Sequence, residues 1–127
     1  MNIFLKLAIL LVIILIIIYI IMLSDTNSLI ADVKSVMKGE VALSETDGTP
    51  LQLYNFSDLL SNAKVNVKIT RLFVLHDFSD GYMWVEYSYE TVKNNNEYMP
   101  GSWRIHSRWT IHKANGKWEI TEIQEDP

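Results

Sequence analysis

The sequence predicts an α+β fold: an N-terminal transmembrane helix, then an amphipathic helix packed on a curved four-stranded antiparallel meander. Three patterns predict it. Residues 3–23 are almost entirely apolar, the next segment repeats its apolar residues at helical spacing, and apolar residues alternate with polar ones from residue 64 onward. We therefore divide the chain of 127 residues into a transmembrane anchor (1–23), a juxtamembrane helix (24–40) and a small extracytoplasmic α+β domain (41–127).

The anchor is predicted from the length and composition of its apolar run. Of the 21 residues from Ile3 to Leu23, 20 are apolar, and a helix of that length spans about 31 Å, the thickness of one hydrocarbon core. Lys6, its only charge, lies near enough to the end for its ammonium to reach the headgroups. A cleaved signal peptide is the alternative, but it would have a shorter apolar core and small residues before a cleavage site. We therefore expect residues 3–23 to stay in the lipid bilayer.

The orientation of the anchor follows from its flanking charges. Lys6 and the terminal amine lie on the short N-terminal side, and the positive-inside rule places that side in the cytoplasm. The prediction is a single-pass protein of the cell membrane with its N-terminus cytoplasmic and its C-terminal domain outside.

The first element after the anchor is predicted to be an amphipathic helix over about residues 28–38. A polar break rich in helix-capping residues precedes it, and Gly39 follows it. The sequence leaves open whether this helix continues the membrane helix. Residues 40–64 are less clear: residues 46–50 suit a turn, and Ser57 is a candidate cap for a short helix through Leu60. The apolar residues at helical spacing are Leu29, Ile30, Val33, Val36 and Met37.

The first hairpin is predicted from two alternating segments joined by Ser79-Asp80-Gly81, which suits a three-residue loop with Gly in the left-handed position. That loop pairs Phe78 with Tyr82, Leu75 with Val85, and Phe73 with Tyr87. One face is then expected to carry Val65, Val67, Ile69, Phe73 and Leu75 on the first strand and Met83, Val85, Tyr87 and Tyr89 on the second. Leu72, Val74 and Phe78 are expected opposite Trp84 and Tyr82 on the other face. A pair of strands that is apolar on both faces must be covered twice, curl, or offer a contact surface.

The second hairpin has the clearest signal in the chain, because Asn115-Gly116 favours a two-residue turn with both residues at positive φ. This turn pairs Ile111 with Ile120, His112 with Glu119, and Lys113 with Trp118. The apolar and polar faces of both strands agree in that register. On the third strand the residues expected on the apolar face are Trp103, Ile105, Trp109 and Ile111, alternating with Arg104, His106, Arg108, Thr110 and His112.

Residues 109–120, preceded by residues 80–87, resemble the closing strands of small membrane-anchored extracytoplasmic domains with a nuclear transport factor-like or cystatin-like fold. The matching feature is an aromatic-rich meander that ends in Asn-Gly-Lys-Trp, and the resemblance covers residues 65–124. It implies a curved sheet that forms a cone with a pocket inside it.

The candidate binding residues lie on two strands of the meander. Arg104, His106, Arg108 and His112 share one face at a spacing of roughly 7 Å, and could form a ladder that binds anions. An ordinary solvated face with cross-strand partners such as Glu86, Glu90 and Glu119 is the favoured alternative. A shared metal ion is not expected, because six strand residues separate His106 from His112 by about 20 Å. Trp84, with Tyr82 and Tyr98, is the aromatic residue available for a partner.

Composition excludes several function classes. The chain has no Cys, which removes disulfide scaffolds, thiol catalysts and zinc–thiolate sites. Beyond the anchor, the chain has ten Lys and Arg residues and fifteen Asp and Glu residues. This excess of negative charge argues against nucleic acid as a partner. No nucleophile elbow or phosphate-binding loop is present, and we predict neither an enzyme nor a cofactor.

The predicted function is therefore a membrane-anchored module that binds another protein or an envelope component through its aromatic hairpin. A small-ligand module that uses the concave face of the sheet is the alternative. An immunity or inhibitor protein is not separable from the first possibility by sequence. An enzyme acting through His106, His112 and Glu119 is the least favoured hypothesis, since no catalytic motif supports it.

Overall fold

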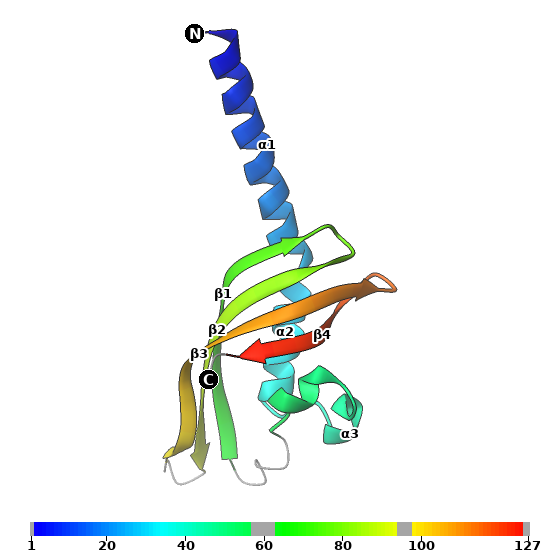
Figure 1. Ribbon diagram of the computed structural model, residues 1–127. Coiled ribbons are helices and arrows are strands. Elements are labelled where there is room, and N and C mark those ends of the chain that lie inside the picture. The colour runs from blue at the N-terminus through cyan, green and yellow to red at the C-terminus, as the bar shows by residue number, and fades with distance from the viewer. Residues whose placement is uncertain (1, 57–62, 94–97, 126–127) are drawn as a thin grey trace.

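The computed structural model describes residues 2–56, 63–93 and 98–125. It confirms the α+β arrangement: a long apolar helix precedes an open antiparallel sheet with strand order β1-β2-β3-β4, and a second helix packs on one face of that sheet (Figure 1). The elements in chain order are α1 (Ile3–Asp25), α2 (Asn27–Met37), α3 (Leu43–Thr46), the 3-10 helix η1 (Pro50–Tyr54), β1 (Ala63–His76), β2 (Asp80–Lys93), β3 (Tyr98–Ala114) and β4 (Lys117–Glu125).

Helix α1 projects away from the sheet (Figure 1); none of its residues is fully buried, and only Tyr19, Met22 and Leu23 near its end pack against the core. Its 23 residues span about 35 Å, and the helix is long and apolar enough to be a transmembrane anchor or a signal sequence. Thr26 alone separates α1 from α2, so the amphipathic helix follows the apolar helix almost directly. The Thr26 hydroxyl donates to the carbonyl oxygen of Met22 at 3.1 Å, which satisfies one of the last acceptors of α1.

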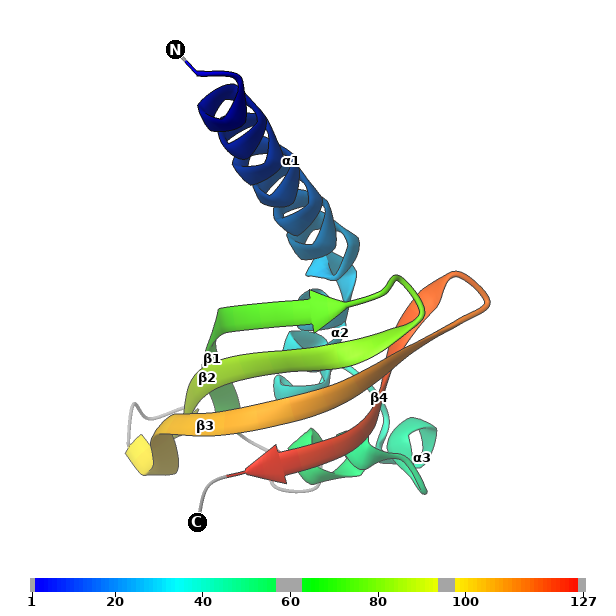
Figure 2. The same cartoon turned by 45° about the horizontal axis from the view of Figure 1, so that its top comes forward.

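Helix α2 covers the inner, concave face of the sheet (Figure 2). It begins and ends one residue earlier than the sequence suggested. Its buried residues repeat at positions 29, 33, 36 and 37, which places them on the single face that meets the strands. Together with Tyr54 of η1 they form one core with the inner face of the sheet. The buried residues that the sheet contributes to this core are Val74, Met83, Val85, Tyr87, Trp109, Ile111, Trp118 and Ile120.

The end of α1 is joined to the sheet by polar contacts. Arg71 of β1 donates to the carbonyl oxygen of Leu23 at 2.9 Å, which caps the negative end of the helix with a cation. The Asp25 carboxylate accepts from the indole N–H of Trp118 at 2.8 Å and from the Lys113 ammonium at 3.2 Å. Both donors hold the pKa of the Asp25 carboxyl below its usual value, and the indole of Trp118 has the larger effect.

His76 belongs to the same junction. Its side chain is 5% exposed, its ring lies 4.6 Å from the Trp118 ring between centroids, and its Nε2 is 3.4 Å from the carbonyl oxygen of Met22. We call Asp25, His76, Lys113 and Trp118 the junction cluster. Three elements, α1, β1 and the β3–β4 hairpin, meet there, so the direction of α1 relative to the sheet is fixed by side-chain contacts.

The predicted register of the first hairpin is wrong. Leu75 pairs with Tyr82 and Phe73 pairs with Trp84, and a bulge between Arg71 and Phe73 places Leu72 out of register. A bulge of one residue reverses which side chains face the core. Val65 remains buried at the start of β1, whereas Val74 and His76 replace Phe73 and Leu75 on the inner face. The predicted inner residues Met83, Val85 and Tyr87 of β2 are confirmed as buried.

The turn of this hairpin also differs from the prediction. Asp77 accepts the backbone N–H groups of Ser79 and Asp80 through its side chain, at 3.0 and 2.8 Å, and Phe78 takes the positive φ of 67°. This side-chain turn moves the loop toward the N-terminus. Gly81 is required for a different reason: a Cβ there would lie 2.2 Å from the carbonyl oxygen of Leu75.

The second hairpin is confirmed in every predicted pair: Ile111 with Ile120, His112 with Glu119, and Lys113 with Trp118. Asn115 and Gly116 have φ values of 53° and 77°, as the predicted two-residue turn requires.

One residue of β3 was assigned to the wrong face. Trp103 is 63% exposed, because a register shift between Tyr87 and Tyr89 and a positive φ of 52° at Arg104 turn it away from the core. The Ser88 hydroxyl accepts the displaced N–H of Arg104 at 2.8 Å, which satisfies the backbone at this bulge.

Residues 40–56 form a short cap beside β4 that contains α3 and η1. The predicted turn at 46–50 lies between α3 and η1, with Gly48 at φ 75°. The predicted helix at Ser57–Leu60 lies outside the described residues.

Candidate functional site

The predicted polar stripe lies on the outer face of the sheet, where three of its four side chains, those of Arg104, His106 and His112, contact carboxylates. Arg104 is 80% exposed and bonds Glu86 at 2.9 Å, and His106 lies 3.4 Å from the same carboxylate. The hydrogen bond from Arg104 lowers the pKa of Glu86. His112 is paired in register with Glu119, but its Nδ1 bonds Asp80 at 2.7 Å. The arrangement is that of cross-strand polar pairs on a solvated face.

Arg108, Tyr82 and Trp84 form a separate group nearer the first hairpin. The Arg108 guanidinium lies 5.3 Å from the centre of the Tyr82 ring and also donates to the side chain of Gln124. The Tyr82 ring is 6.0 Å from the Trp84 ring, which is 5.6 Å from the Phe73 ring of β1. The three rings form a continuous aromatic surface. Tyr82 is 43% exposed and Phe73 is 45% exposed.

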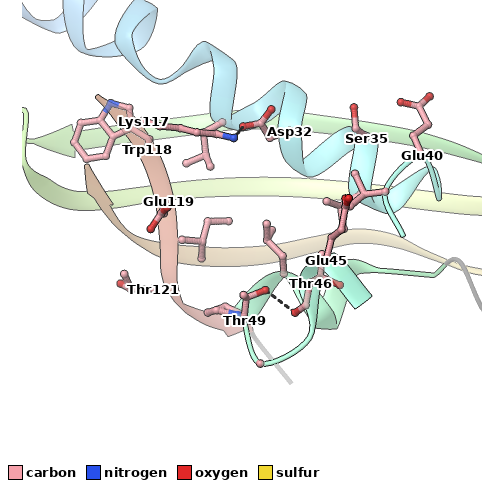
Figure 3. Close-up of a pocket in the computed structure, with 17 residues that line it drawn as sticks. Asp32, Ser35, Glu40, Glu45, Thr46, Thr49, Lys117, Trp118, Glu119 and Thr121 are labelled. Atoms are coloured by element: carbon pink, nitrogen blue, oxygen red, sulfur yellow. Dashed lines mark hydrogen bonds and ion pairs between the residues drawn. The ribbon is translucent and has the colours of Figure 1, made fainter. Parts of the chain in front are cut away.

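A groove that the sequence did not predict opens on the opposite side of the molecule. It has a volume of about 860 Å³ and lies between α2, residues 40–51 and β4 (Figure 3). This volume is within the range of sites that bind drug-sized ligands. The apolar residues that line it are Leu29, Val36, Val41, Leu51, Trp118 and Ile120, and the charged ones are Asp32, Glu40, Glu45, Lys117 and Glu119.

One wall of the groove is the edge of the sheet. β4 is the last strand in the order, and its residues 117–121 line the groove consecutively. In an antiparallel ladder, alternate residues direct their N–H and C=O groups away from the partner strand. Along this stretch those groups therefore face the groove, and no strand of the described sheet pairs with them. An unpaired edge of this kind is a template for an added strand.

The groove has a negative rim. Four carboxylates and one ammonium line it, and the ammonium, that of Lys117, is 3.6 Å from Asp32. Glu40, Glu45 and Glu119 form no ion pair with any residue that the structure describes. A cationic group entering the groove would therefore meet carboxylates that no internal cation neutralises.

The wall opposite β4 is held by hydrogen bonds within residues 40–56. Thr49 donates through its hydroxyl to the carbonyl oxygen of Thr46 at 2.7 Å (Figure 3). The buried Asn55 amide donates to the Thr46 hydroxyl at 2.9 Å and to the carbonyl oxygen of Ala42 at 3.3 Å. These bonds replace the ladder that a strand would provide, so the irregular segment keeps a defined shape beside the sheet edge.

No periodicity in the sequence marks the groove, because its walls come from α2, an irregular segment and β4, which meet only in three dimensions. The sequence predicted three of its parts separately, namely the amphipathic helix, the turn at residues 46–50 and the Asn-Gly turn that sets the faces of β4, but not that they meet. Among the residues that the structure describes, no group of three or more His, Asp and Glu side chains is placed to hold a metal ion.

Comparisons with protein-family models, with curated proteins and with solved structures found no match to this chain.

Proposed function

We propose that the protein is a single-pass membrane protein whose α+β domain binds an extended, basic segment of a partner protein in the groove beside β4. The observation that carries this proposal is the groove itself, since one of its walls is an unpaired strand edge and its rim is negative. Main-chain hydrogen bonds along β4 would give affinity, and the carboxylates would select basic side chains.

The retention of α1 as an anchor is part of this proposal, and the junction of α1 with the domain supports it. Arg71 bonds the carbonyl oxygen of Leu23, Asp25 bonds Trp118, and Met22 and Leu23 pack against the core. Cleavage of a signal peptide near these residues would remove groups that the folded domain uses. An uncleaved span over residues 3–23, with the N-terminus in the cytoplasm and the domain outside the cell membrane, is the arrangement we propose.

The position of the groove suits a partner that approaches from the aqueous phase. In the sheet, β4 is the edge strand opposite β1; its first residues reach the end of α1 through Trp118, and α3 lies at the end of the domain away from α1 (Figure 1). The groove is therefore open to a partner while α1 remains in the bilayer. The proposed role is non-enzymatic, because His106 and His112 each pair with a carboxylate on the outer face, away from the groove.

The experiment is a binding selection with a library of random dodecapeptides displayed on phage, using the full chain in detergent micelles. We expect enriched peptides that are rich in Lys, Arg and β-branched residues. The double variant Glu45→Lys, Glu119→Lys should weaken the binding of an enriched peptide at least about tenfold, because the two new lysines would repel the basic side chains of the peptide. The matched control is Glu122→Lys, which changes an exposed carboxylate of the same strand that does not line the groove.

A small cationic ligand is the second candidate, since the volume of the groove also fits one. Amide hydrogen exchange separates the two candidates. A bound peptide strand would protect alternate amides of residues 117–121, whereas a small ligand held by side chains would leave them exchanging. Enriched peptides that bind the double variant and the wild type equally would contradict the groove proposal.

A further inference from the structure

Apolar side chains are exposed on β1 next to the end of α1. Leu72, Phe73 and Leu75 are 51%, 45% and 52% exposed, and Phe78 at the tip of the hairpin is 43% exposed. We call these four residues the β1 apolar strip. Exposed apolar side chains gathered on one edge of a small domain mark an interaction surface. The bulge at Leu72 directs Phe73 and Leu75 outward, so the strip depends on a break in regular pairing.

The strip is continuous with the apolar helix. The Tyr19 ring of α1 stacks on the Phe73 ring with 5.5 Å between centroids, and the Tyr19 hydroxyl accepts the backbone N–H of Val74 at 3.4 Å. Tyr19 lies four residues before Leu23, the last residue of the apolar run, which is about 6 Å along the helix axis. When residues 3–23 span a bilayer, Phe73 is therefore level with the last turn of the span.

Near the first hairpin, two rows of outer-face side chains become more polar from β1 to β3. The strands are ordered from β1, whose Phe73 stacks on Tyr19 of α1, to β4 at the opposite edge of the sheet (Figure 2). Neighbours in register on the outer face run from Phe73 to Trp84 to Arg108. The adjacent row runs from Leu75 to Tyr82 to Thr110 in the same direction. Both rows pass from apolar residues through Trp or Tyr to polar residues, which is the order of environments from hydrocarbon through the interface to water.

We propose that the β1 edge of the sheet rests in the headgroup region of the bilayer that α1 crosses, with the β1 apolar strip inserted and Trp84 and Tyr82 at the interface. The proposal rests on the anchoring of α1 proposed above. A protein partner would not need apolar residues at β1 to give way to polar residues at β3. A lipid surface requires that order, with the apolar residues on the side of the bilayer that α1 crosses. The domain is then held close to the membrane at one orientation, and the groove beside β4 faces the aqueous phase.

The test uses the absence of cysteine from the chain, which allows single nitroxide labels on the full protein in phosphatidylcholine vesicles. Labels are placed by Leu75→Cys, Ile9→Cys and Leu53→Cys, and their collisions with oxygen and with a water-soluble nickel chelate are measured. Leu53 of η1 is the matched control, because it is the same residue type at 56% exposure and lies away from α1.

We expect the label at residue 75 to lose nickel accessibility relative to the label at residue 53, and to approach the lipid-buried label at residue 9. Equal nickel accessibility at residues 75 and 53, with residue 9 protected, would overturn the inference while leaving the anchor intact. Nickel access at residue 9 would show that the anchor itself fails, and the inference would fall with it. Spin–spin broadening at residue 75 that disappears on dilution with unlabelled chain would mean that a second copy covers the strip, which also overturns it.

Discussion

At the scale of single residues, the domain depends on a few buried polar groups that are satisfied by side chains far away in the sequence. The Tyr54 hydroxyl accepts the indole N–H of Trp109 at 3.0 Å and bonds the Ser107 hydroxyl at 3.1 Å. Trp109 is fully buried and Tyr54 nearly so. This network ties η1, and with it one wall of the groove, to the third strand of the sheet.

Tyr54→Phe should therefore destabilise the domain by about 1–3 kcal/mol, because it leaves the buried Trp109 N–H without an acceptor. The matched control is Tyr82→Phe, which removes a hydroxyl from an exposed ring and should cost less than about 0.5 kcal/mol. Urea unfolding of the full chain in micelles, followed by tryptophan fluorescence, measures both. Equal effects of the two variants would contradict the assigned network.

The junction cluster predicts how stability depends on pH. Asp25 lies beyond the proposed span of residues 3–23, and its folded-state pKa is lowered from 3.8 by its bonds to Trp118 and Lys113. Ionised Asp25 thus adds stability above the unfolded-state pKa, and this contribution is lost as pH falls below 3.8 through the lower folded-state value. Asp25→Asn should reduce stability at neutral pH and should flatten the loss of stability in acid. Urea midpoints for both proteins at neutral and acidic pH measure this, and parallel acid losses would refute it.

At the scale of elements, hairpins were predictable where the turn residues fix the backbone. The Asn115-Gly116 turn has both residues at positive φ, and every predicted pair around it is confirmed. The predicted register of the first hairpin was wrong, because the Asp77 side chain forms a turn that begins earlier in the chain than Gly81 suggested. One bulge, at Leu72, then reversed the faces of the rest of β1. Bulges are stabilised by tertiary packing, which an alternating pattern does not report.

Gly81→Ala and Gly116→Ala separate two uses of glycine. At Gly116 a Cβ would meet nothing within 4 Å, and the positive φ of 77° is the only difficulty, so the cost should be about 1–2 kcal/mol. At Gly81 the Cβ would lie 2.2 Å from the backbone oxygen of Leu75, and the strands must separate at about 3 kcal/mol or more. Urea unfolding of both variants ranks them, and a reversed order would contradict the described register.

The candidate site was predictable only in part, and for the same reason. The positions of Tyr82 and Trp84 on the outer face follow from simple alternation along β2, which contains no bulge between them. The partners of the polar stripe could not be predicted in this way. Asp80 rather than Glu119 bonds His112, because the turn at Asp77 makes the second strand begin at residue 80. The groove was missed altogether, since residues 40–56 carry no repeating pattern.

At the scale of the whole molecule, α1 and the domain form one structure rather than a domain on a loose tether. Tyr19, Met22 and Leu23 pack against the core from the helix side, and Arg71 and Asp25 bond across the junction. A fixed junction gives the domain one orientation relative to the bilayer. It also separates the two proposed surfaces, with lipid contacts at β1 and the groove at β4.

Two truncations test whether the end of α1 belongs to the folded domain. Deleting residues 1–18 retains Tyr19, Met22 and Leu23, whereas deleting residues 1–23 removes them. The longer deletion should be less stable by about 1–3 kcal/mol, the value of burying one or two apolar side chains. For a domain of this size that lowers the melting temperature by about 4 °C or more. Identical melting curves in the same detergent would show that the domain is independent of α1.

The central claim is that the apolar helix is retained as an anchor and completes the fold of the domain. The most direct test is the intact mass and cell fraction of the protein after expression with its own N-terminus. We expect a chain with residues 3–23 still attached, close to 14.7 kDa, that remains in the membrane fraction after washing with carbonate at high pH. A shorter chain that begins after Leu23 and is released into the soluble fraction would contradict the account.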